Sequence, residues 1–238
     1  MSISDLEAAL VEAQGRWKTA RNSSSQEDVA TARETLLRAQ RALFLAKGEE
    51  TALACAWEIP WGTGAPLPHV VSSGMSTYLM YVANEPDPDW DGSYVREMRT
   101  MDPHRIALVK FIDCYAYQFG GPNDEVLVGH RLWGKGLAPY SAHVIANSRW
   151  LAEMEHINKV HPGYHPDKWR TLKHYLLLFH DEQFECLAQG YTLEVFQDSL
   201  EHVAELARTR LFERENRLSD SFGDKKANRI SLRTGNNG

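Results

Sequence analysis

The sequence has few cysteines and no long uninterrupted apolar run. Its three cysteines, Cys55, Cys114 and Cys186, lie far apart without CxxC spacing, which argues against a disulfide framework or a structural zinc site. Charged residues interrupt every apolar run well before the roughly 18 residues that a membrane-spanning helix needs. The N-terminal residues lack the basic and apolar regions of a secretory signal. We therefore expect a cytoplasmic protein with reduced thiols and no membrane partner.

Positive charge is also scarce. The chain of 238 residues has a formal net charge of −6, whereas nucleic-acid binding is built from clustered Lys and Arg. We therefore predict no nucleic-acid partner. The one basic stretch is residues 223–238, which end in Gly-Asn-Asn-Gly and are predicted to form a flexible tail. Because 43% of the residues are hydrophobic, the rest of the chain is able to bury a sizeable core.

Helical periodicity is clear near both ends of the chain. Capping boxes that begin at Ser4 and Ser24 each precede an apolar stripe, which predicts a helical hairpin over residues 4–47. A further stripe predicts a C-terminal helix over about residues 198–217. A third helix is predicted over about 141–160, before a His-Pro-Gly break.

Strand patterns occupy the middle of the chain. An alternating run over 106–119, a Gly-Gly-Pro-Asn-Asp turn and a return over 125–132 predict one β-hairpin. Apolar runs over 174–179 and 184–191 predict a second hairpin around a polar tip. A shorter buried strand is predicted over 77–82.

These patterns predict an α+β fold. Its antiparallel sheet is built from the two long hairpins, preceded by the helical hairpin and closed by the C-terminal helix. The predicted division is a helical hairpin appendage at 1–48, an α+β domain at 49–222 and the basic tail at 223–238. The Trp- and Pro-rich segment 57–68 is predicted to be an ordered loop that lies across the main body.

An acidic segment suggests a metal site. Asp87, Asp89 and Asp91 alternate before Gly92, as in the first half of a calcium loop, but the twelfth position holds Met98 instead of a bidentate glutamate. The three aspartates are therefore candidate ligands of a divalent cation, and a plain acidic turn is the alternative.

A second group of polar residues suggests a pocket. The candidate acid-base residues are Asp113, His130 and His180, and His180 has acidic neighbours in Asp181 and Glu182. Candidate ligand-binding residues supply an apolar wall beside them: Trp61, Tyr115, Trp133 and Trp150. The alternative is that all of these are ordinary strand, edge and turn residues.

Three functions follow from these candidates. The preferred one is a small-molecule-binding protein with a pocket between the sheet and the tryptophan-bearing loops. An enzyme that uses histidine and carboxylate acid-base chemistry, or a bound divalent cation, is the first alternative. The second is an interaction module in which the helical hairpin binds another protein or a second copy of the chain. No Gly-x-Ser-x-Gly elbow points to a serine nucleophile.

Overall fold

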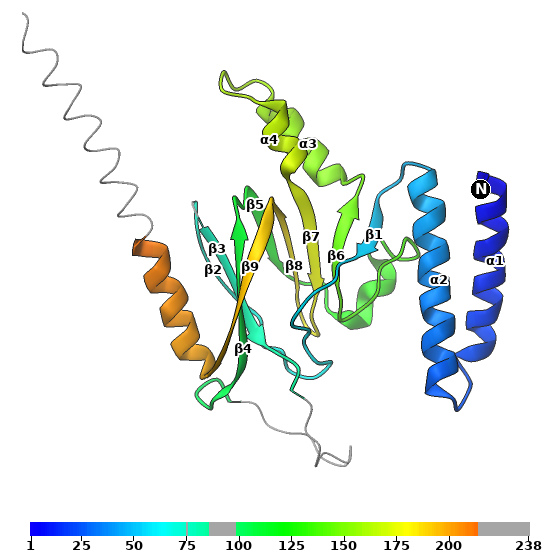
Figure 1. Ribbon diagram of the computed structural model, residues 1–238, viewed down its shortest axis with the longest axis horizontal. Coiled ribbons are helices and arrows are strands. Elements are labelled where there is room, and N and C mark those ends of the chain that lie inside the picture. Colours follow the sequence, from blue (N-terminus) through cyan, green and yellow to red (C-terminus); the bar gives the residue numbers. More distant parts are fainter. Residues whose placement is uncertain (75, 86–98, 214–238) are drawn as a thin grey trace, which may run out of the picture. The chain divides into compact units, whose positions relative to one another are not determined.

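The structure is a computed structural model that describes residues 1–74, 76–85 and 99–213. Figure 1 shows helices at the two ends of this part of the chain and antiparallel strands between them, so the predicted α+β class is confirmed. The elements in chain order are α1 (Ile3–Ala20), α2 (Gln26–Ala46), β1 (Thr51–Ala54), β2 (His69–Ser73), β3 (Ser76–Val82), β4 (His104–Ile112), β5 (Ala116–Gly120), a 3-10 helix (Asp124–Gly129), β6 (Ala142–Ala146), α3 (Arg149–Asn158), α4 (Pro166–Thr171), β7 (Lys173–Leu178), β8 (Gln183–Ala188), β9 (Gly190–Asp198) and a C-terminal helix over 200–213.

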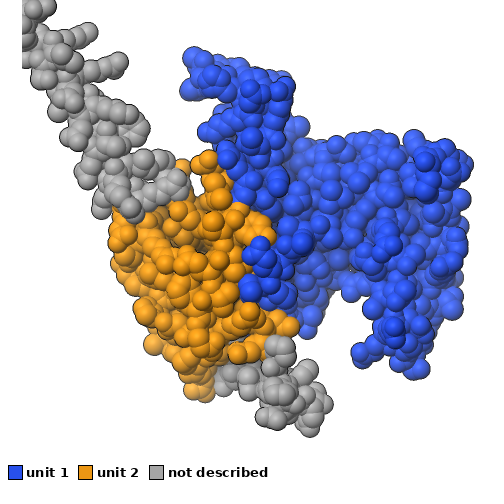
Figure 2. All heavy atoms as spheres, in the orientation of Figure 1, with its two compact units in different colours: residues 1–66, 114–190 blue, residues 67–113, 191–238 orange. Residues whose placement is uncertain are grey.

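The chain divides into two compact units (Figure 2). The first contains residues 1–66 and 114–190, and the second contains the described residues within 67–113 and 191–238. Each unit has its own antiparallel sheet. The division at residues 48 and 222 that we drew from the sequence stays a prediction.

The predicted N-terminal helical hairpin is confirmed, with shifted caps. The first helix is capped by Ser2 rather than Ser4: the Ser2 hydroxyl accepts a hydrogen bond from the Asp5 amide, and the Asp5 carboxylate accepts one from the Ser2 amide. The second is capped by Ser25 rather than Ser24. In both cases a second serine lies within two positions and is also able to accept from the free amides of the first turn. The sequence alone therefore does not show which serine is the cap.

The sheet of the first unit has the strand order β1-β6-β7-β8-β5. Its hairpin β7–β8 confirms the second predicted hairpin. The first predicted hairpin is wrong, because residues 124–129 form a 3-10 helix, and β5 pairs with β8 instead. The predicted helix over 141–160 is also wrong in its first part, where β6 fills the centre of the sheet between β1 and β7.

The second unit is built around an apolar core. Its sheet has the order β2-β3-β4-β9, and β3 is buried along its whole length, as the run over 77–82 predicts. The C-terminal helix inserts Leu200, Val203, Ala207 and Leu211 into a cluster with side chains of β3 and β4. The apolar stripe of this helix is therefore what attaches it to the sheet.

In the first unit, a glycine allows α2 to approach the chain near β1. Gly136 has a φ of +89°, and a Cβ built on it would lie 2.5 Å from Cγ of Arg41 and 2.6 Å from the carbonyl oxygen of Ala52. Only glycine tolerates both the positive φ and this contact. The Gly136 amide donates to Oε1 of Gln40 at 3.1 Å, which ties α2 to this loop.

Candidate functional site

A pocket of about 430 Å³ opens in the first unit, within the size range of small-molecule sites. It lies between α2, the end of β1, the tryptophan-bearing loop and residues 138–143. Its lining includes charged, aromatic and polar side chains: Arg33, Glu34, Arg41, Trp57, Trp61, Tyr140, Ser141 and His143. The first part of the predicted ordered loop, with Trp57, Pro60 and Trp61, forms one wall of this pocket.

Trp61 is a fixed part of that wall. Its indole Nε1 donates to the carbonyl oxygen of Leu178 at 2.9 Å, and its ring centroid lies 4.5 Å from that of Phe179. Trp57 meets Trp61 edge to face at 6.5 Å and stays half-buried. A buried indole with its polar atom satisfied supports a second, more accessible indole, so the wall offers an aromatic surface to a ligand.

The α2 side of the pocket carries positive charge. Nε of Arg41 donates to the carbonyl of Ala52 at 3.1 Å, and Nη2 donates to that of Gly136 at 3.0 Å. Burial lowers the pKa of the Arg41 guanidinium, and Glu34, 3.8 Å away, acts in the opposite direction. Arg33 lies about two turns earlier in the helix and is exposed, with no acidic partner among the described residues. The pocket lining thus has two guanidinium groups and one carboxylate.

His143 forms the floor on the β6 side and is fully buried. Its Nε2 lies 3.0 Å from the carbonyl oxygen of Ala138. Burial, with a smaller contribution from the charge of Arg41, lowers the pKa of His143 to about 4, against the hydrogen bond to Ala138. The imidazole is therefore neutral at neutral pH and adds no charge to the pocket.

Tyr140 is held at the pocket by two residues from distant segments. Its backbone has a φ of 54°, and its hydroxyl donates to the Asp124 carboxylate. Nδ1 of His180 lies 3.2 Å from Oδ2 of Asp124 and 3.3 Å from the Tyr140 hydroxyl. Burial and the Asp124 carboxylate raise the pKa of Tyr140 to about 12, so the phenol keeps its proton. His180 therefore pairs with a carboxylate, but the partner is Asp124 and not Asp181 or Glu182, which follow His180 in the sequence.

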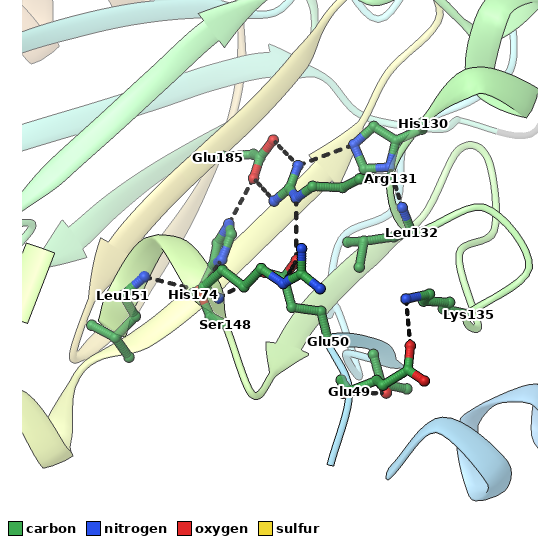
Figure 3. A network of polar contacts seen from close by, with 12 residues as sticks. Glu49, Glu50, His130, Arg131, Leu132, Lys135, Ser148, Leu151, His174 and Glu185 are labelled. Atoms are coloured by element: carbon green, nitrogen blue, oxygen red, sulfur yellow. Dashed lines mark hydrogen bonds and ion pairs between the residues drawn. The ribbon is translucent and has the colours of Figure 1, made fainter. Parts of the chain in front are cut away.

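A second polar group lies within the same unit (Figure 3). Glu185, on β8, receives both Nη atoms of Arg131 at 2.8 and 3.3 Å. Its Oε2 also lies 2.7 Å from Nε2 of His174, on β7. Nδ1 of His174 in turn lies 2.7 Å from Oγ of Ser148, which caps α3 by accepting from the Leu151 amide at 3.0 Å. Ser148, His174, Glu185 and Arg131 are therefore joined in one continuous series of hydrogen bonds. Ser148 follows the end of β6, His174 and Glu185 lie on β7 and β8, and Arg131 lies in a loop.

The electrostatics of this group centre on Glu185. Burial alone raises the pKa of its carboxyl, but the hydrogen bonds from His174 and Arg131 and the charge of Arg131 outweigh it and lower the pKa to about 2. His130 lies beside Arg131, with its Nε2 3.4 Å from Nη1. Burial and the charge of Arg131 lower the pKa of His130. Arg131 also lies 3.8 Å from Glu50, a second buried carboxylate.

The other candidate ligand-binding residues occupy separate places. The Trp150 ring packs edge to face on His174 at 5.1 Å, and Tyr115 packs on Trp169 at 4.8 Å. Trp133 is 46% exposed. Of the tryptophans and tyrosine predicted from the sequence, Trp61 is the one that the described pocket lining includes.

Asp113 falls in the second unit, at a φ of 48°. The predicted cation ligands Asp87, Asp89 and Asp91 lie outside the described residues. Within the residues that the structure does describe, no three His, Cys, Asp or Glu side chains are arranged to hold a metal ion. No helix in this part of the chain has the length and apolar character to cross a membrane. The cytoplasmic location and self-association through α1 and α2 stay predictions.

Comparisons with family models, with curated proteins and with solved structures gave no match.

Two functional residues that sequence reasoning did not select had usable signals. Glu185 is an acid in the middle of an apolar strand, and a buried charge needs a partner. Ser148 follows Asn147 directly before an apolar helical stripe, which is the position of a helix cap. No local signal identifies Arg131 as the partner of Glu185, because 54 positions separate them.

Proposed function

We propose that the chain binds a small organic anion with an aromatic or apolar body in the pocket beside Trp57 and Trp61. The single observation that carries the proposal is the composition of this pocket: an aromatic wall faces a helix that bears two arginines. Most binding sites for small molecules combine apolar walls with a few polar groups that select the ligand. The pocket of about 430 Å³ has this composition.

The charge of the ligand follows from the polar groups of the lining. Arg41 is fixed by two backbone carbonyls, whereas Arg33 is exposed on the same helix face. A guanidinium binds carboxylate or phosphate with paired hydrogen bonds. His143 is neutral and Tyr140 keeps its proton, so neither side chain changes the charge of the lining. An acidic ligand therefore finds more attraction than a basic one.

The experiment is calorimetric titration with naphthalene-2-carboxylate and other aromatic carboxylates, each paired with its uncharged carboxamide. We expect the acids to bind more tightly than their amides. Trp57→Ala is expected to weaken binding about tenfold or more, which is roughly 1.4 kcal/mol. Arg33→Ala is expected to remove the preference for the acid over the amide.

Arg170→Ala is the control, because Arg170 is 77% exposed and pairs with Asp167, and neither residue is part of the pocket lining. It should leave both affinities unchanged. Equal affinity for acid and amide in the wild-type protein contradicts the proposed charge preference. Binding that survives Trp57→Ala unchanged places the ligand elsewhere.

A further inference from the structure

The hydrogen-bonded chain around Glu185 has the geometry of a nucleophilic site. Ser148 lies where β6 ends and α3 begins, His174 lies on β7 and Glu185 on the adjacent β8. The two links of the chain, Oγ to Nδ1 and Nε2 to Oε2, are both 2.7 Å. A hydroxyl within hydrogen-bond reach of an imidazole that a carboxylate orients is the arrangement of an activated serine.

The polar atoms of this chain can all be satisfied with His174 neutral. Nε2–H donates to the Glu185 carboxylate, and Nδ1 then accepts the hydroxyl proton of Ser148. The Ser148 oxygen still accepts the Leu151 amide at 3.0 Å. This leaves the imidazole with a lone pair directed at the serine proton, which is what a general base needs.

The backbone places Ser148 at a sharp turn. Asn147, directly before it, has a φ of 52°, in the left-handed region that asparagine enters more readily than most residues other than glycine. The turn places Oγ of Ser148 at the N-terminus of α3, a helix of ten residues. The positive end of a helix stabilises negative charge that develops beside it.

We propose that Ser148, His174 and Glu185 form a triad that transfers acyl groups from carboxylic esters to water. Ser148 is the nucleophile and His174 the general base. Glu185 is a positioning residue, and Arg131 in turn holds Glu185. The site differs from the pocket at Trp61 and does not depend on it, since none of the three triad residues belongs to the lining of that pocket.

The step balances without a cofactor. The Ser148 oxygen forms a bond to the acyl carbon while its proton passes to Nδ1 of His174, and the carbonyl electron pair moves onto its oxygen. When that pair returns, the bond to the alcohol oxygen breaks, and the alcohol leaves with the proton from His174. Water then attacks the acyl-serine with His174 again as base, which releases the carboxylic acid and restores the serine hydroxyl.

Steric access limits the substrate. Ser148 is 8% exposed and His174 is fully buried, with the half-buried Trp150 ring against the imidazole. This favours small acyl groups over peptides or long chains. Exclusion of water around the developing charge also strengthens the electrostatic effect of the helix.

The test is covalent labelling of the full chain with methanesulfonyl fluoride, a small sulfonyl fluoride, followed by peptide mass spectrometry. Attack by Ser148 forms an oxygen–sulfur bond, fluoride leaves and the proton goes to His174. We expect one adduct on the peptide that contains Ser148. His174→Gln is expected to slow labelling at least about 100-fold, and Glu185→Gln to slow it less.

Ser25→Ala is the matched control. Ser25 caps α2 as Ser148 caps α3, but no imidazole contacts its hydroxyl in the described hydrogen bonds. Both alanine variants lose a helix cap, but Ser148→Ala should abolish labelling and Ser25→Ala should not. A folded wild-type chain that acquires no adduct at Ser148 overturns the proposal, and so does labelling at an unchanged rate in His174→Gln.

Discussion

The two compact units fill their interiors with different chemistry. The first unit buries Glu50, His143, His174 and Glu185. Among its described residues, the second unit buries no Asp, Glu, His, Lys or Arg side chain, and its core cluster is apolar. Both sheets are antiparallel, so the difference does not come from strand topology.

This difference separates what a fold needs from what a site needs. A buried charge must be paired and hydrogen-bonded to be tolerated, and a hydrocarbon core of equal volume is often as stable. The second unit shows that this chain can build a sheet without buried charge. The paired charges in the first unit are therefore not a requirement of sheet formation, and the proposed triad draws its residues from them.

The largest expected effect is at Glu185. Glu185→Gln removes the charge that Arg131 and His174 share, and the free energy of unfolding of the first unit should fall by about 3–5 kcal/mol at pH 7. Because the folded-state pKa of Glu185 is lowered to about 2 from 4.5, this contribution is complete above pH 4.5 and is lost as the pH falls toward 2. The cost of the substitution should shrink in that window.

The measurement is urea unfolding followed by tryptophan fluorescence. Six of the seven tryptophans belong to the first unit, so the signal reports mainly on that unit. A loss below about 1 kcal/mol at pH 7, within the range of surface ion pairs, would show that the buried network does not differ from an exposed one.

The next effect is acid sensitivity near the pocket. Burial lowers the folded-state pKa of His143 to about 4 from 6.5, so the folded state takes up a proton at a lower pH than the unfolded state does. Stability is complete above pH 6.5 and should fall by about 2–3 kcal/mol as the pH drops through 4. His143→Gln should remove this part of the pH dependence. Identical stability profiles for the variant and the wild type between pH 4 and 7 would contradict it.

The smallest effect is expected in the second unit. Arg210 and Glu194 form a bidentate pair at 2.5 and 3.1 Å, similar in geometry to Arg131 and Glu185, but half of the Glu194 side chain is exposed. Glu194→Gln should therefore cost less than about 1 kcal/mol, measured by hydrogen exchange of β9 amides. A cost equal to that of Glu185→Gln would remove the contrast between the two units.

Local patterns predicted the elements that need only local information. The helical hairpin and the hairpin β7–β8 were found because the periodicity of each segment states which face is buried. The segment 125–132 failed because a strong turn followed by apolar residues is compatible with either a return strand or a 3-10 helix. The strand that does pair with β5 lies more than 60 positions away.

The same limit applies to the candidate sites. Trp61 was predicted from its loop, and the pairing of His180 with a carboxylate was expected, but Asp124 is 56 positions from His180. Ser148 was missed, despite its capping signal, because residues 141–160 carry an apolar pattern that continues from β6 into α3 and was interpreted as one helix. The break between β6 and α3 is marked by the positive φ of Asn147. The spacing of the apolar residues does not show it.

What the sequence by itself determined is the α+β class, the terminal helices and the apolar hairpin, because propensity, capping and side-chain period act over a few residues. Tertiary structure alone decided which strands share a sheet and hence which polar groups meet. Arg131, Ser148, His174 and Glu185 acquire a common role only when β6, β7 and β8 become neighbours, since each buried polar atom then depends on a partner that the chain supplies from far away.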